Sequence, residues 1–279
     1  MESLFEAAAR CLMACEVEEK LHLTQQTAKA WRNGLLSLDC KDGPEPIGEP
    51  GHPAKPVLVT PDQVPKRGLG TQEGLAALVH AMAHIEFNAI NLAWDAVYRF
   101  RDLPESYYSD WITVVHEEAD HFQLLCTRLN ELGTDYGNFT AHNGLWDMAK
   151  RTAYDPMVRM ALVPRVLEAR GLDVTPGIIK RLRQVGDEKT VAVLEIILRD
   201  EVGHVAIGSH WFKYCCQQRG LDSEQTFREL ISQYFTRQMS GPFDYAARQK
   251  AGFTVTELEA LECMKDSTEL SKKIPSNCP

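Results

Sequence analysis

One short pattern, Glu-x-x-His, occurs twice in this chain and limits what the chain can fold into. It runs from Glu118 to His121 and again from Glu201 to His204, and each copy lies in a segment whose apolar residues recur with helical spacing. Residues three apart lie on the same face of an α-helix, so the carboxylate and the imidazole can bind one metal ion together. Two such motifs in separate helices predict an all-α protein whose ligands face its core.

Two further acidic residues extend this pattern. Glu86 precedes Glu118 by 32 residues, and Glu168 precedes Glu201 by 33. Each interval suits a helix, a loop and a second helix, which is the ligand order of four-helix bundles that bind two metal ions. The predicted metal ligands are Glu86, Glu118, His121, Glu168, Glu201 and His204.

The neighbours of these acids favour a buried site. The positions on the same helical face as Glu86, Glu118 and Glu201 are apolar, whereas the face of Glu168 also carries Arg165. A carboxylate facing a core costs several kcal/mol unless it has a partner such as a metal ion. Any one of these acids by itself fits a solvated face or a surface ion pair, and a single histidine fits ordinary packing. The six together favour the metal site.

Residues beside the ligands suggest supporting roles. Glu117 and Asp200 directly precede the ligand acids, and we expect Glu117 to accept a hydrogen bond from His204 and Asp200 from His121. Plain surface charge is the alternative for both.

Three other histidines complete the list of polar candidates. His142 lies in the connection after the second core helix, where it is a candidate for a substrate entrance. His80 and His84 lie away from the face of Glu86 and are assigned to the surface or to packing beside the site.

Helical periodicity, capping residues and the positions of Gly and Pro predict the organisation of the chain. The expected core helices span 71–98, 105–132, 147–170 and 189–219, with a kink at Pro164 and a short helical arm at 175–186. Helical segments at 4–35, 223–239 and 254–266 and an extended Pro-rich arm at 39–67 flank them. The predicted parts are an N-terminal region, 1–70, a four-helix bundle, 71–220, and a C-terminal helical extension, 221–279.

Composition excludes several classes of protein. The net charge of −9 argues against broad attraction to nucleic acids or anionic membranes. The N-terminus lacks the features of a signal peptide or a spanning helix, and the eight cysteines lack the spacing of a zinc ribbon, so we expect a cytoplasmic protein with reduced thiols. No motif for NAD, flavin or haem is present.

Several runs of sequence resemble a known family. HIEFNAINLAWDAVYRF, DWITVVHEEADHFQLL, YGNFTAHNGLWD, VPRVLEARGLDVTP and LRDEVGHVAIG are similar, in this order, to bacterial ferritin-like proteins of unknown function. The resemblance covers roughly residues 65–220. It implies the four-helix core of the ferritin, rubrerythrin and ribonucleotide reductase superfamily, with a di-metal centre at the six residues named above.

The ligand set and the resemblance together suggest a function. Four carboxylates and two imidazoles suit two iron ions, with manganese or a mixed pair as alternatives. We expect an O₂-dependent hydroxylase or oxidase that acts on a small molecule, takes electrons from an external donor and forms a monomer or small homo-oligomer. A tRNA substrate is possible but less favoured. The rival functions are iron handling or peroxide scavenging, as in ferritins and rubrerythrins, and a non-catalytic scaffold stabilised by metal.

Overall fold

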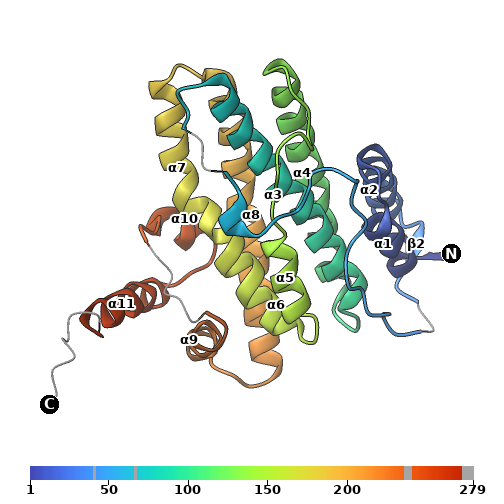
Figure 1. Ribbon diagram of the computed structural model, residues 1–279. Coiled ribbons are helices and arrows are strands. Elements are labelled where there is room, and N and C mark those ends of the chain that lie inside the picture. Colours follow the sequence, from blue (N-terminus) through green and yellow to red (C-terminus); the bar gives the residue numbers. More distant parts are fainter. Residues whose placement is uncertain (40–41, 66–67, 236–240, 272–279) are drawn as a thin grey trace, which may run out of the picture. The chain divides into compact units, whose positions relative to one another are not determined.

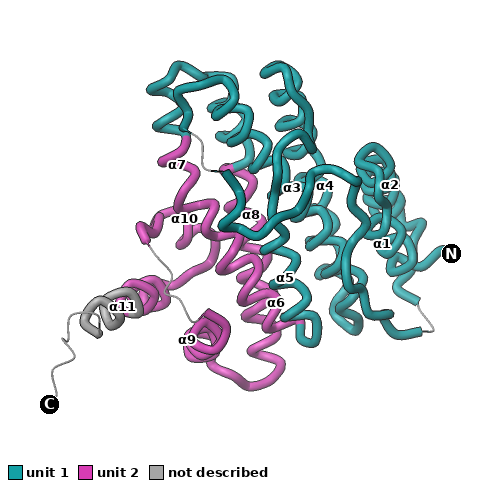
Figure 2. The backbone as a smooth tube through the Cα atoms, in the orientation of Figure 1, with its two compact units in different colours: residues 1–155, 179–197 teal, residues 156–178, 198–279 magenta. Residues whose placement is uncertain are grey.

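The computed structural model describes residues 1–39, 42–65, 68–235 and 241–271, with side chains up to residue 263. The described chain is mostly helical, which confirms the all-α prediction (Figure 1). It divides into two compact units, residues 1–155 with 179–197 and residues 156–178 with 198–279 (Figure 2). The division falls within two helices, α7 (Ala169–Gln184) and α8 (Glu188–Gln218). The predicted boundaries near 70 and 220 stay predictions.

The first unit is built on a long helical hairpin, α3 (Gln72–Arg99) and α4 (Glu105–Glu131). The side chain of Thr71, the first residue of the predicted range, caps α3 by accepting a hydrogen bond from the Gly74 amide at 3.0 Å. A five-residue turn joins the two helices, which pack side by side along their length (Figure 1). Both helices lie within a residue or two of their predicted ranges, because their apolar periodicity and their end signals agree.

The N-terminal residues cover this hairpin. Helix α1 (Leu4–Met13) packs on α3, and α2 (Val17–Arg32) packs on α4. The fully buried Lys20 donates hydrogen bonds to the carbonyls of Cys11 and Leu12 at 2.9 and 2.8 Å, so it binds the C-terminal end of α1. Two short strands, β1 (Glu2–Ser3) and β2 (Leu36–Ser37), pair in parallel beside these helices.

The Pro-rich arm lies largely without regular structure in the first unit, as predicted for the residues that the structure describes. Its only helical turn in the described residues 42–65 is η1 (Pro61–Gln63). Backbone hydrogen bonds join it to the connection after α4, from the Val59 amide to the Ala141 carbonyl at 2.8 Å and from the Ala141 amide to the Val57 carbonyl at 3.1 Å. These bonds hold the arm against the connection.

The prediction of where the third core helix begins is wrong. Instead of one helix from Asp147, the chain forms α5 (Gly144–Arg151) and α6 (Pro156–Leu162). Pro156 opens α6 at the first helical position and disfavours helical geometry in the residue before it, so the chain breaks over 152–155.

The predicted end of that helix is also wrong. The chain does not stop at Gly171 but continues as α7 to Gln184, through Pro176, and residues 175–186 form no separate hairpin arm. Gly171 does not adopt the left-handed conformation of a helix-ending glycine. The neighbouring Leu172 is fully buried and Asp173 is held in an ion pair, so tertiary contacts override the local stop signal.

A π-helical segment, η2 (Val163–Glu168), joins α6 to α7. Pro164 has no amide hydrogen to donate to the carbonyl four residues earlier, which explains why regular α-helical bonding fails where the sequence predicts a kink. Within the second unit Pro164 packs against Gly208 of α8, where a Cβ atom would lie only 2.3 Å from the proline Cβ. The backbones of η2 and α8 therefore approach closely at this point.

The second unit ends in helices α9 (Ser223–Tyr234), α10 (Tyr245–Lys250) and α11 (Val255–Ser271). Helix α10 was not predicted, and residues 236–239 of the predicted helix 223–239 lie outside the described residues. Among the described residues, no helix combines the length and the apolar composition that a membrane span requires.

Candidate metal centre

Glu86 lies at the buried face of α3. Its side chain is almost fully enclosed, and the residues one turn away on the same face, Ala83 and Ile90, are buried and apolar. The predicted face of the helix is therefore confirmed. A carboxylate in such surroundings is costly unless a cation or a proton compensates its charge.

Helix α4 contributes Glu118 and His121 to the same place. Both are 1% exposed. The Nδ1 atom of His121 lies 3.5 Å from Oε2 of Glu118 and 3.7 Å from Oε2 of Glu86. The first unit thus brings three predicted ligands from two helices into one buried carboxylate and histidine cluster.

The spacing of this cluster suits a metal ion. The ligand atoms of Glu86, Glu118 and His121 lie within 4.8 Å of one another. Bonds of about 2.0–2.2 Å from one divalent ion hold its ligand atoms within roughly 4.4 Å of one another, so a small adjustment would place all three around one ion. Two carboxylates and one imidazole are also the hard to borderline donors that iron, manganese and zinc accept. The residues therefore fit a metal ion.

The two carboxylates raise the pKa of His121. Burial lowers the pKa of His121, but interaction with the negatively charged Glu118 and Glu86 outweighs that effect and raises the pKa to about 11. A protonated His121 compensates one of the two carboxylates. A metal ion needs the neutral imidazole, so binding would release this proton.

The second unit holds the other three predicted ligands. Glu201 and His204 lie one turn apart on α8, with 3.7 Å between Oε1 of Glu201 and Nδ1 of His204. His204 is buried, and Glu201 and Glu168 are half-buried. Glu168 is the last residue of η2, and Gly208, which η2 contacts, lies one turn after His204. Each unit therefore carries one Glu and one Glu-x-x-His.

The predicted supporting residues stay predictions. Asp200 is half-buried and accepts two hydrogen bonds from the Arg199 side chain, at 2.8 and 3.1 Å. Glu117 is half-buried on α4. The expected pairs, Glu117 with His204 and Asp200 with His121, each join one unit to the other.

His80 and His84 are not surface residues, which corrects one of the two roles assigned to them. Both are buried, because the connection after α4 folds over α3 and stacks Tyr136 on His80 with 5.3 Å between ring centroids. Both ring nitrogens of His84 have polar partners: Nε2 lies 3.2 Å from the His142 carbonyl oxygen, and Nδ1 lies 2.9 Å from the Tyr136 hydroxyl. Burial lowers the pKa of each histidine to about 4. His142 has an exposed side chain, and its role at an entrance stays a prediction.

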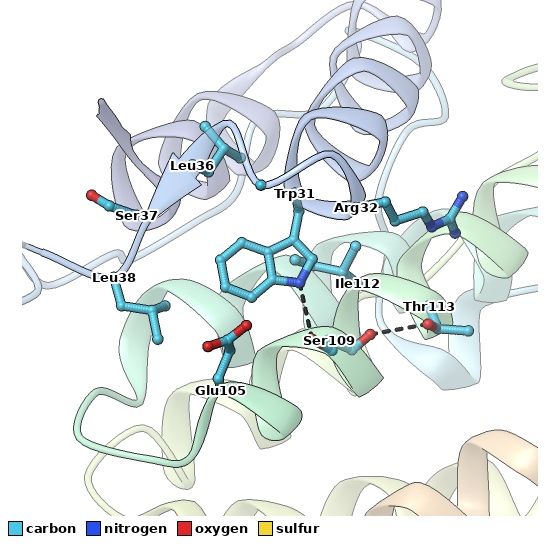
Figure 3. Close-up of a pocket in the computed structure, with 10 residues that line it drawn as sticks. Trp31, Arg32, Leu36, Ser37, Leu38, Glu105, Ser109, Ile112 and Thr113 are labelled. Atoms are coloured by element: carbon cyan, nitrogen blue, oxygen red, sulfur yellow. Dashed lines mark hydrogen bonds between the residues drawn. The ribbon is translucent and has the colours of Figure 1, made fainter.

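A cleft of about 480 Å³ lies elsewhere in the first unit, between the end of α2, β2 and the start of α4 (Figure 3). The Trp31 indole forms one side and donates to the Ser109 hydroxyl at 3.0 Å. The α4 residues that line the cleft, from Glu105 to Thr113, lie on the face opposite Glu118 and His121. This cleft is therefore separate from the carboxylate and histidine cluster.

Sequence reasoning missed two groups of polar residues. The buried pair of His84 and Tyr136 joins α3 to the connection after α4; the aromatic residues of that connection were the available signal. Arg165 was noted only as a polar neighbour of Glu168, whereas it forms a buried ion pair with Glu257 at 2.6 Å. Nothing local in the sequence marks a pair 92 residues apart.

The fold and the cluster define a class, an all-α, mostly helical protein with a buried carboxylate and histidine site that could hold a metal ion. The chain belongs to the family described as "Protein of unknown function (DUF455)", which it matches over residues 13–259. It is 50% identical over 258 residues to an "Uncharacterized protein" of Haemophilus influenzae (strain ATCC 51907 / DSM 11121 / KW20 / Rd), covering 89% of this chain and 90% of that relative. No solved structure matches the chain.

Proposed function

We propose that this protein is a ferritin-like di-iron carboxylate enzyme, an O₂-dependent hydroxylase or oxidase of a small substrate. The observation that carries the proposal is the buried cluster of Glu86, Glu118 and His121. In the proposed bundle, the helices that carry Glu168, Glu201 and His204 supply the matching half. The repeated order of ligands along the chain supports this assembly.

Charge supports two metal ions rather than one. Four carboxylates and two neutral imidazoles carry a charge of −4, which two divalent ions balance. When bound, such a pair of redox-active ions supplies the electrons that reduce O₂ for substrate oxidation. An external protein would return these electrons, because the sequence has no flavin or nicotinamide motif.

The side chains of this protein would hold and shield the ions. Glu86, Glu118 and His121 bind, and the buried neighbours Phe87 and Phe122, whose ring centroids lie 5.6 Å apart, exclude water from their side of the site. A dry site strengthens the interaction between the carboxylates and a cation. Loss of the His121 proton makes the imidazole available as a ligand.

Metal analysis of protein expressed with added iron tests the proposal. We expect about two irons per chain, an O₂-dependent near-ultraviolet band and the Mössbauer signal of paired ferric ions. A Glu118→Ala, His204→Ala double variant should lose all three. Glu105→Gln, which changes an exposed acid on the same helix α4, is the matched control and should keep them.

The outcomes separate the alternatives. Wild-type protein without metal, or with metal that the double variant retains, would refute the ligand assignment. Intact iron with O₂ consumption in the presence of a reductant, but with ferric mineral as the product, would favour iron handling over substrate oxidation.

A further inference from the structure

The π-helical segment η2 carries a buried arginine next to a predicted metal ligand. Arg165 lies three residues before Glu168 and is 0% exposed. Its guanidinium donates to Glu257 of α11 at 2.6 Å, and Glu257 is 2% exposed. An ion pair so fully buried is costly to break, because the remaining charge has no water to stabilise it.

Three aromatic rings enclose the same guanidinium. Its central carbon lies 4.0 Å from the ring centroid of Phe227, 4.4 Å from that of Phe253 and 4.8 Å from that of Phe212. These rings come from α9, from the residues just before α11 and from α8. Cation and ring contacts of this kind favour one placement of the arginine and disfavour its rotation out of the cage.

Glu257 is itself held in place at the start of α11. Its Oε2 accepts from the Thr254 amide at 2.9 Å, while the Thr254 hydroxyl accepts from the Glu257 amide at 3.0 Å. This reciprocal pair is a capping box. One carboxylate oxygen thus caps α11 and the other binds Arg165, so α11 is joined rigidly to η2.

A π-helical turn needs such external support. It spreads one additional residue over a turn and loses regular α-helical bonding, so local preference favours a return to the α-helical register. A shift of one residue would rotate Glu168 about the helix axis and away from its present direction. Pro164 against Gly208 fixes one side of the turn, and Arg165 fixes another.

We infer that the Arg165 and Glu257 ion pair is a positioning device that holds the π-helical turn in the register that directs Glu168 toward the metal centre. This inference rests on the proposed function for the role of Glu168 as a ligand. The C-terminal extension then serves to position Glu168, although its helix α11 lies far from the predicted ligands in sequence.

The test uses Glu257→Gln in the full-length chain. Glutamine keeps the capping box, because its amide oxygen can accept from Thr254, but it removes the negative charge that binds Arg165. The matched control is Lys213→Met, which removes another attachment of the C-terminal extension, the hydrogen bond from Lys213 to the Gly252 carbonyl at 2.6 Å. Both variants weaken the attachment of the extension, but only Glu257→Gln acts on Arg165.

Two measurements are made on each protein. Cobalt(II) titration, followed by its visible absorption, reports affinity and coordination, and hydrogen exchange of metal-free protein reports the order of residues 160–170. We expect Glu257→Gln to bind cobalt about 10–100 times more weakly, with a changed spectrum. We also expect exchange in 160–170 to be at least about ten times faster, while Lys213→Met matches the wild type in both measurements.

Wild-type affinity and exchange in Glu257→Gln would overturn the inference. Equal losses in both variants would overturn it as well, because general docking of the extension would then account for the effect. A wild-type chain that binds no cobalt would refute the proposed function instead, and hydrogen exchange would still decide whether the ion pair holds the turn.

Discussion

Gly208→Ala should damage both stability and metal binding. The new Cβ atom would lie 2.3 Å from Cβ and 2.4 Å from Cγ of Pro164. Carbon atoms pack at about 3.5–4.0 Å, so Pro164 must retreat by more than ~1 Å. Overpacking of this kind costs about 1–3 kcal/mol. The same retreat moves η2, which carries Glu168, away from the helix that carries His204.

Gly203→Ala is the matched control on the same helix. Gly203 is exposed, lies one residue before His204, and has no atom within 4 Å of an added Cβ. Replacing a helical glycine there should stabilise the protein by about 0.5–1 kcal/mol. Since both variants gain the same helical preference, the difference between them isolates the clash.

Thermal unfolding measures this difference. At roughly 2–4 °C per kcal/mol, a clash of about 1–3 kcal/mol means that Gly208→Ala should melt roughly 2–12 °C below Gly203→Ala. It should also bind less metal, while Gly203→Ala binds as the wild type does. Equal melting temperatures would refute the close approach of η2 and α8, and a lower melting temperature with unchanged metal binding would refute its link to the ligands.

Three further predictions concern titration and capping. Bound metal must displace the proton of His121, whose pKa is about 11, so apparent metal affinity should rise about tenfold per pH unit between pH 6 and 8. Calorimetry in two buffers should detect the released proton. A metal affinity independent of pH would contradict this prediction. The pKa values of His80 and His84 are about 4 in the folded protein, below the unfolded value of 6.5, so the unfolded chain takes up protons first as pH falls. Their contribution to the free energy of unfolding is therefore complete above pH 6.5 and is lost as pH falls toward 4. Melting curves from pH 7.5 to 4.5 should therefore fall more steeply for the wild type than for a His80→Gln, His84→Gln variant, and parallel curves would contradict the assignment. Lys20→Met removes both hydrogen bonds to the end of α1 and should lower the free energy of unfolding by about 1–3 kcal/mol, measured by chemical denaturation. Lys29→Met, on the same helix, is the control and should have little effect.

Much of the fold follows from local pattern. The ranges of α3, α4 and α8 were predicted to within a residue or two, since an apolar stripe and end signals, such as the Thr71 cap of α3 and the glycines after α4 and α8, act within one helix. The cluster of Glu86, Glu118 and His121 followed as well. Their spacing places each on the apolar face of its helix, and the short turn between α3 and α4 lets those faces meet.

The errors occur where distant residues decide the outcome. Gly171 signals a helix end, but the burial of Leu172 and the ion pair of Asp173 with Arg248 extend α7 past it. His80 and His84 were assigned to the surface or to packing beside the site, and the structure buries both beneath Tyr136. In both cases the deciding partner lies more than 50 residues away in sequence.

The sequence by itself determined that the chain is helical, which acids and histidines share the apolar faces, and where Pro164 interrupts regular bonding, because each depends on neighbours within a few turns. Only the tertiary structure decided how that interruption resolves. A π-helical turn is stable here because Gly208 admits Pro164 and because Glu257, 92 residues along the chain, balances the buried charge of Arg165. The free energy that holds the turn comes from contacts between segments far apart in sequence, and such contacts form only once the chain has folded.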